Sequence, residues 1–218
     1  MEKIIVVGSG GHAKVVIDII EKTGKYKILG LIDSYRFPKE TVCGYEILGN
    51  ESVLLQLKGE IYGGVVAIGD NWIRNKVVDK IKSIVPWFKF VSLVHPSAVL
   101  GNSVMIGDGT IVMAGSVINS NVIIGEHSII NTKSSVDHDC FIGDYCTIAP
   151  GVTLGGNIKM GSYSVVSLGA NIIHSIHIGE HTIIGAGSTV VRNIGSYAVA
   201  YGTPAKRIRT RTVGEKYL

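Results

Sequence analysis

Cysteine is scarce in the 218-residue sequence: Cys43, Cys140 and Cys146 occur without the spacing of metal ligands. Sparse thiols, and a first segment without the layout of a secretion signal, predict a cytoplasmic protein whose cysteines stay reduced. Long apolar runs are lacking too, since none reaches the ~18 residues that a membrane-spanning helix needs. We therefore expect no membrane insertion.

Charged residues are also few, at 17% of the chain. Together with abundant Ile and Val, this excludes a disordered chain and favours strands. The net charge of +4 comes from the end of the sequence, because the last fourteen residues hold five basic residues and one acidic residue, leaving 16 of each sign before them. A neutral body argues against nucleic acid as a partner. The basic C-terminal tail, residues 201–218, is either a solvated terminus or a clamp for a phosphate group.

A strict repeat fills the second half of the chain. Every sixth residue from Leu100 to Val190 is aliphatic or methionine, at sixteen consecutive positions, and glycine follows at eight of them. Four residues after the aliphatic position stands Ser, Thr, Ala or Cys in ten cases. A period of six fits neither a helix nor an amphipathic strand and predicts a triangular coil with eighteen residues per turn. We assign residues 93–200 to about five such turns, with aliphatic side chains inside and glycine serving the turn.

Residues 1–92 follow a different pattern. Strand-like runs at 3–7, 27–32 and 65–68, with helical spacing between and after them, predict a small α/β Rossmann-like domain. Its first turn, Gly8-Ser9-Gly10-Gly11-His12, is close to a dinucleotide fingerprint, and Asp33 ends the second strand. Because the domain is too short for a complete dinucleotide site, we interpret the turn as a nucleotide-sugar site at a helix N-terminus. A glycine turn needed only for packing is the alternative.

One of the seven histidines has a distinctive setting. His138 stands between Asp137 and Asp139. A carboxylate bonded to one ring nitrogen would fix the imidazole tautomer and raise the basicity of the other nitrogen. His138 is therefore a candidate general base, and a solvated loop histidine is the alternative.

Three segments resemble a known family: Gly8–His12, the run Asn131-Thr132-Lys133-Ser134-Ser135-Val136-Asp137-His138-Asp139, and Gly202-Thr203-Pro204-Ala205-Lys206. They are similar to the bacterial sugar acetyltransferases that join a small Rossmann-like domain to a hexapeptide-repeat coil. The resemblance implies a left-handed parallel β-helix, a homotrimer with active sites between neighbouring coils, and acetyl-CoA as cosubstrate without a metal. It implies His138 as general base, made more basic by Asp139. The implied nucleotide-sugar contacts are Gly10, Gly11, His12, Asp33, Ser34 and Gly69, and the implied acetyl-CoA contacts are Thr147, Leu168 and Ala186.

The sequence predicts the acceptor substrate less specifically than it predicts the family. We expect N-acetylation of a nucleotide-linked 4-amino-4,6-dideoxy sugar in bacterial polysaccharide or glycoprotein synthesis, because the glycine turn is of the nucleotide-binding type. O-acetylation of sialic acid or another sugar hydroxyl is one alternative, and a non-catalytic nucleotide-sugar-binding scaffold is another. A zinc enzyme on the same coil would need clustered histidines, and no two share a face on adjacent turns. We expect direct transfer without an acyl-enzyme, because Cys140 and Cys146 occupy the small corner slot.

Overall fold

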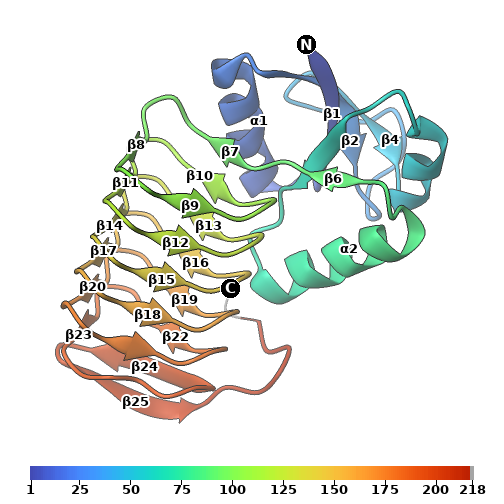
Figure 1. The fold of residues 1–218 in the computed structure, drawn as a ribbon. Helices are drawn as coiled ribbons and strands as arrows, with labels where there is room; N and C mark the ends of the chain where they lie inside the picture. The colour runs from blue at the N-terminus through green and yellow to red at the C-terminus, as the bar shows by residue number, and fades with distance from the viewer. Residues whose placement is uncertain (217–218) are drawn as a thin grey trace.

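The computed structural model describes residues 1–216 and has two parts, an α/β domain and a column of stacked turns (Figure 1). The α/β domain contains β1 (Glu2–Val7), α1 (Gly11–Thr23), β2 (Tyr26–Ile32), β3 (Thr41–Val42), β4 (Tyr45–Gly49), a 3₁₀ helix (Glu51–Leu57), β5 (Gly63–Val66), α2 (Asn71–Ile84) and β6 (Lys89–Phe90). Within residues 1–216, no helix is both long and apolar enough to cross a bilayer.

The sheet of the first domain has the order β3-β4-β2-β1-β5-β6 and is parallel except for the β3–β4 pair. Its central strand is buried on both faces. Ile4 and Val6 pack in one apolar cluster with α1, whereas Ile5 and Val7 pack in another with α2. Helices on both faces explain why the strand is a continuous apolar run, and the arrangement is the expected doubly wound one.

The column is a left-handed β-helix of two-residue strands stacked in three parallel sheets. Each strand pairs with the strand eighteen residues further on, as Ile129 does with Thr147. The strands are β7 (Leu93–Val94), β8 (Val99–Leu100), β9 (Met105–Ile106), β10 (Ile111–Val112), β11 (Val117–Ile118), β12 (Ile123–Ile124), β13 (Ile129–Ile130), β14 (Ser135–Val136), β15 (Phe141–Ile142), β16 (Thr147–Ile148), β17 (Thr153–Leu154), β18 (Lys159–Met160), β19 (Val165–Val166), β20 (Asn171–Ile172), β21 (His177–Ile178), β22 (Ile183–Ile184) and β23 (Thr189–Val190).

Each corner of the coil from Ser103 to Gly187 turns on one residue with positive φ. This corner position recurs every six residues from Ser103 to Gly187, and ten of its fifteen residues are not glycine. The left-handed region is costly for most side chains, although Asn, Asp and His tolerate it better. The coil therefore imposes this backbone on residues as different as His127, Lys133 and Tyr145.

The glycines that follow the aliphatic position have a different role from the one the sequence suggested. Gly143 and Gly155 do not have positive φ, so they do not make the turn. A Cβ on Gly143 would lie 2.7 Å from the backbone nitrogen of Ser162, and one on Gly155 would lie 2.6 Å from that of His174. The chain passes so close to the next turn of the coil that only a hydrogen fits between them.

The small residues inside the corners are hydrogen-bonded to the next turn of the coil. The Thr110 hydroxyl donates to the Gly125 carbonyl at 2.7 Å, and the Ser128 hydroxyl donates to the Gly143 carbonyl at 2.9 Å. The Cys140 thiol donates in the same way to the Gly155 carbonyl at 3.3 Å. Where the slot holds Ser, Thr or Cys, its short donor satisfies a carbonyl of the next turn, and a buried carbonyl without a partner would be costly.

The end of the coil is closed by a hairpin. Strand β24 (Ala198–Gly202) continues one sheet in parallel, and β25 (Ala205–Thr210) returns antiparallel on it. Arg211 is only 1% exposed and donates to the carbonyl of Tyr163 at 3.2 Å. Residues 205–211 are therefore ordered on the coil, while Lys206, Arg207 and Arg209 keep exposed side chains on the hairpin.

The α/β domain packs against one corner of the coil. The contact is made by an aromatic column, which consists of His127, Tyr145, Tyr163, His181 and Tyr197. Neighbouring rings stack with centroids 4.8–5.1 Å apart. Trp72 of α2 stacks on two of these rings, at 5.2 Å from Tyr163 and 4.7 Å from His181. Stacked rings of this kind stabilise an interface beyond the area they bury.

Arg74 of α2 strengthens the same junction. Its Nε donates to the carbonyl of His127 at 2.7 Å, and its Nη1 donates to the carbonyls of Ile68 and Gly69 at 2.8 Å. Its Nη2 donates to Asn71, whose side chain in turn accepts the Thr147 hydroxyl at 2.6 Å. The guanidinium thus ties the α/β domain to the corner carbonyls of the coil.

Candidate active site

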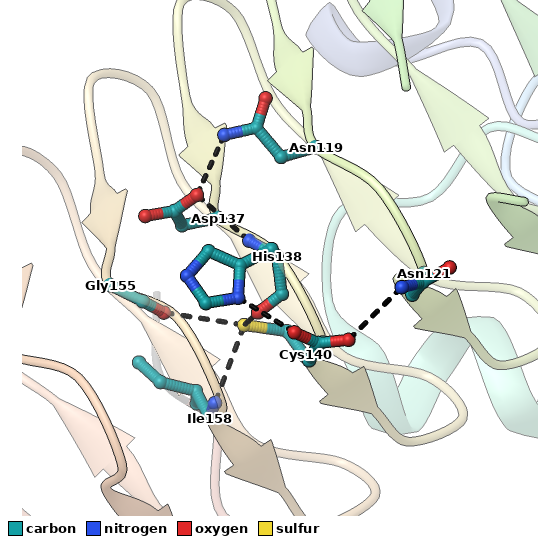
Figure 2. Close-up of polar contacts among 8 residues, drawn as sticks. Asn119, Asn121, Asp137, His138, Cys140, Gly155 and Ile158 are labelled. Carbon is teal, nitrogen blue, oxygen red and sulfur yellow. Dashed lines mark hydrogen bonds and ion pairs between the residues drawn. The ribbon is translucent and has the colours of Figure 1, made fainter. Parts of the chain in front are cut away.

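His138 follows β14 at a corner of the coil, and its ring is held by the next residue. Asp139 occupies the left-handed corner position, with φ 58°, and its Oδ2 lies 2.7 Å from His138 Nδ1. In Figure 2 this interaction is the dashed line from the His138 ring to the carboxylate drawn without a label. Asp137, on the other side, accepts the backbone N–H of His138 at 2.8 Å. The two acids therefore have separate functions, since one holds the ring and the other holds the backbone.

Two asparagines on the preceding turn support these acids. Asn119 donates to Asp137 Oδ1 at 2.7 Å, and Asn121 donates to Asp139 Oδ1 at 3.2 Å (Figure 2). Each asparagine lies eighteen residues before its acid, which is one turn of the coil. Sequence reasoning missed both residues, although that spacing was available to find them.

The acidic residues beside His138 determine which nitrogen of its ring is basic. The hydrogen bond to Asp139, together with the charges of Asp137 and Asp139, holds the pKa of His138 above its ordinary value. The same bond, followed by the bond from Asn121, lowers the pKa of Asp139. An ionised carboxylate only accepts hydrogen bonds, so in the neutral imidazole Nδ1 carries the proton and Nε2 keeps its lone pair.

Space for the imidazole comes from a glycine on the following turn. A Cβ on Gly156 would lie 2.6 Å from His138 Nε2. Any side chain at position 156 would therefore displace the nitrogen that has the free lone pair. Gly156 is a second feature that the sequence did not reveal, because its role depends on the stacking of turns.

The predicted nucleotide-sugar residues gather at the carboxyl edge of the first sheet. Gly10, Gly11 and His12 begin α1, Asp33 and Ser34 follow β2, and Gly69 follows β5. A Cβ on Gly10, Gly11 or Gly69 would meet no atom within 4 Å, so the space beside each of these Cα atoms holds no protein atom. Open N–H groups at a helix N-terminus attract phosphate.

The side chains at this edge are already oriented by local bonds. Asp33 accepts the Ser9 hydroxyl at 2.5 Å and the backbone N–H of Tyr35 at 2.8 Å. The Ser34 hydroxyl donates to Glu51 at 2.7 Å. Burial, and the nearby charge of Arg74, lower the pKa of His12 to about 4, so its imidazole is neutral at pH 7.

The predicted acetyl-CoA residues do not lie together. Leu168 and Ala186 are exposed and occupy equivalent positions on consecutive turns. They precede Gly169 and Gly187, where a Cβ would meet no atom within 4 Å. Thr147 is instead buried at the domain junction, where its hydroxyl donates to Asn71.

Comparison with known proteins connects the chain to sugar acetyltransferases. The family model of the PglD N-terminal domain matches residues 3–81. UDP-N-acetylbacillosamine N-acetyltransferase of Bacillus subtilis (strain 168) is 33% identical over 118 residues, and the alignment spans 52% of this chain and 52% of that protein.

Solved structures match over nearly the whole length. PerB from Caulobacter crescentus, in complex with CoA and GDP-perosamine, is 37% identical with a TM-score of 0.89, covering 96% of this chain and 98% of that chain. The acetyltransferase domain of PglB from Neisseria gonorrhoeae, in complex with acetyl coenzyme A, is 33% identical with a TM-score of 0.88, covering 95% and 99%. The fold and these similarities define an acyltransferase. The chain belongs to the family of hexapeptide-repeat sugar acetyltransferases that carry a PglD-type N-terminal domain.

Proposed function

We propose that this chain transfers an acetyl group from acetyl-CoA to the amino group of a nucleotide-linked 4-amino-4,6-dideoxy sugar. The observation that carries the proposal is the His138–Asp139 pair, whose 2.7 Å bond leaves Nε2 as a free base on an exposed corner. Support comes from two relatives, PerB in complex with CoA and GDP-perosamine and a UDP-N-acetylbacillosamine N-acetyltransferase.

The reaction requires only one proton carrier. The acceptor amine attacks the thioester carbonyl, and His138 Nε2 takes the proton that the amine loses. The C–S bond then breaks, and the same imidazolium returns its proton to the leaving thiolate, giving the amide and free CoA. Direct transfer also agrees with the cysteines, because burial raises the pKa of the Cys146 thiol to about 12, far from a nucleophilic thiolate.

The acceptor would be bound by the α/β domain. Its diphosphate would meet the N–H groups of the glycine turn at α1, and Asp33 would accept hydrogen bonds from a ribose or a base. His12, Ser34 and Gly69 line the same edge. O-acetylation of a sugar hydroxyl remains the alternative reaction, and it would depend more heavily on His138 because a hydroxyl is the weaker nucleophile.

The positions of these parts support assembly as a homotrimer. The α/β domain docks on the corner of the aromatic column, which includes His127 and Tyr145, whereas His138 lies on a different corner of the triangle. A second coil would therefore complete the site by placing its base opposite the nucleotide edge. The third corner of the triangle contains Gly169 and Gly187 beside Leu168 and Ala186. Acetyl-CoA would lie along this corner, because its narrow pantetheine chain can approach a backbone that carries no side chains.

A thiol-release assay tests the proposal. Purified protein with acetyl-CoA is offered UDP-, dTDP- and GDP-linked 4-amino sugars, and free sialic acid in parallel. We expect release with one nucleotide amino sugar and a fall in kcat of roughly 10²–10⁴-fold in His138→Ala.

His174→Ala is the matched control, because His174 occupies the equivalent exposed position two turns further on and has no acidic residue beside it. Release with sialic acid alone would favour O-acetylation. Wild-type turnover in His138→Ala would refute the assignment of the base.

A further inference from the structure

Asn121 and Asp139 occupy the same column of corner positions on neighbouring turns. Both have left-handed backbones, with φ 62° and 58°, and both side chains are exposed. Because consecutive turns stack in register, equivalent side chains in such a column lie side by side. The column therefore brings an amide donor next to the carboxylate that binds the candidate base.

The carboxylate of Asp139 is shared between two donors, one on each oxygen. Oδ2 meets His138 Nδ1 at 2.7 Å, and Oδ1 accepts Asn121 Nδ2 at 3.2 Å (Figure 2). Among residues 1–216, no other side chain is hydrogen-bonded to this carboxylate. Since the Asp139 side chain is 46% exposed, water competes for both oxygens, and Asn121 is the group that restrains its rotation.

We propose that Asn121 is a positioning residue for the reaction. Its amide fixes the Asp139 carboxylate so that Oδ2 stays on Nδ1 and the lone pair of His138 stays on Nε2. The inference rests on the proposed function of His138 as the base, and it adds a residue that acts through Asp139 without touching a substrate. Loss of such an outer partner typically slows a site by ~10-fold or more.

Two variants remove the bond in different ways. Asn121→Gly deletes the side chain while tolerating the left-handed backbone. Asn121→Asp keeps the shape but replaces the donor by an acceptor and adds a negative charge. The matched control is Asn157→Gly, because Asn157 lies in the same column one turn after Asp139, has φ 59° and is also exposed, with no bond to Asp139.

Kinetics give the first readout. We expect kcat to fall ~10-fold in Asn121→Gly and Asn121→Asp, with KM for both substrates within about twofold of wild type, and no such change in Asn157→Gly. In Asn121→Gly the acidic limb of the kcat profile should move to lower pH, because the bond that raises the pKa of His138 is weakened. Wild-type kcat in both variants, or a loss no larger than in Asn157→Gly, would overturn the role.

An NMR titration of the His138 ring gives a readout that needs no substrate. Asn121→Gly should lower the pKa of His138, whereas Asn121→Asp should not lower it, because the added charge favours the imidazolium. An unchanged pKa of His138 in Asn121→Gly would refute the positioning claim even if activity fell. Because this test uses the protein alone, its outcome is independent of whether the acceptor has been identified correctly.

Discussion

Replacing Arg74 by methionine removes the guanidinium that joins the two domains while keeping most of its apolar volume. The side chain is 1% exposed and makes three bonds of 2.7–2.8 Å to the carbonyls of His127, Ile68 and Gly69. A hydrogen bond to a charged group contributes ~1.5–3 kcal/mol, and each buried carbonyl left without a partner costs ~1–3 kcal/mol. Such costs are not additive, because the site relaxes. We expect the free energy of unfolding to fall by ~3–5 kcal/mol.

Urea unfolding followed by the fluorescence of Trp72, in a Trp87→Phe background that leaves it as the single tryptophan, reports on this junction because that indole stacks on the coil. The comparison should be made at several protein concentrations, so that any effect of assembly is separated from folding. Arg36→Met is the matched control, because Arg36 is exposed and its one ion pair within residues 1–216 is the i,i+4 pair with Glu40. Surface pairs contribute ~0–1 kcal/mol. Equal losses in the two variants would refute the claim that Arg74 joins the domains.

Three further outcomes test the coil and its chemistry. Gly143→Ala should destabilise the coil far more than Gly195→Ala in thermal unfolding, because a Cβ at Gly195 would meet no atom within 4 Å; equal Tm values would contradict the proposed packing role of the glycine. Burial lowers the pKa of His127 to about 3, so protonation of the unfolded state should reduce stability as pH falls from ~6.5 toward 3. His127→Tyr, which repeats the ring at Tyr145, should flatten that dependence in urea midpoints, and an unchanged slope would refute this assignment. Cys146→Ser should keep wild-type thiol release, since serine supplies the same buried donor, and loss of turnover in a folded variant would revive an acyl-enzyme.

The six-residue period was enough to predict the coil, because one aliphatic position per hexapeptide defines both the face length and the interior. It did not reveal the left-handed corner position. Ser103, Lys133 and Tyr145 share a backbone conformation there and no side-chain property. A pattern based on residue type cannot find a position whose common feature is φ alone.

The candidate base was predictable, and its surroundings were only partly so. His138 and Asp139 are neighbours in sequence, so their pairing could be expected from the chain itself. Asn121 was accessible in principle, because it precedes Asp139 by one turn of eighteen residues. The bond between Thr147 and Asn71 was not accessible, because it joins two domains whose relative placement no spacing encodes.

All three edges of the coil share the same left-handed backbone at the corner position, whereas the side chain at that position varies. The edges can therefore have different functions. Rings at this position, such as Tyr163, form the edge on which α2 docks. Polar residues such as Asn121 and Asp139 form the exposed edge that holds the candidate base. Glycines such as Gly169 and Gly187 leave the third edge bare. Since the α/β domain covers one edge and the candidate base lies on another, a single chain separates the proposed acceptor site from the proposed base, and the proposed reaction would need a neighbouring coil to bring them together.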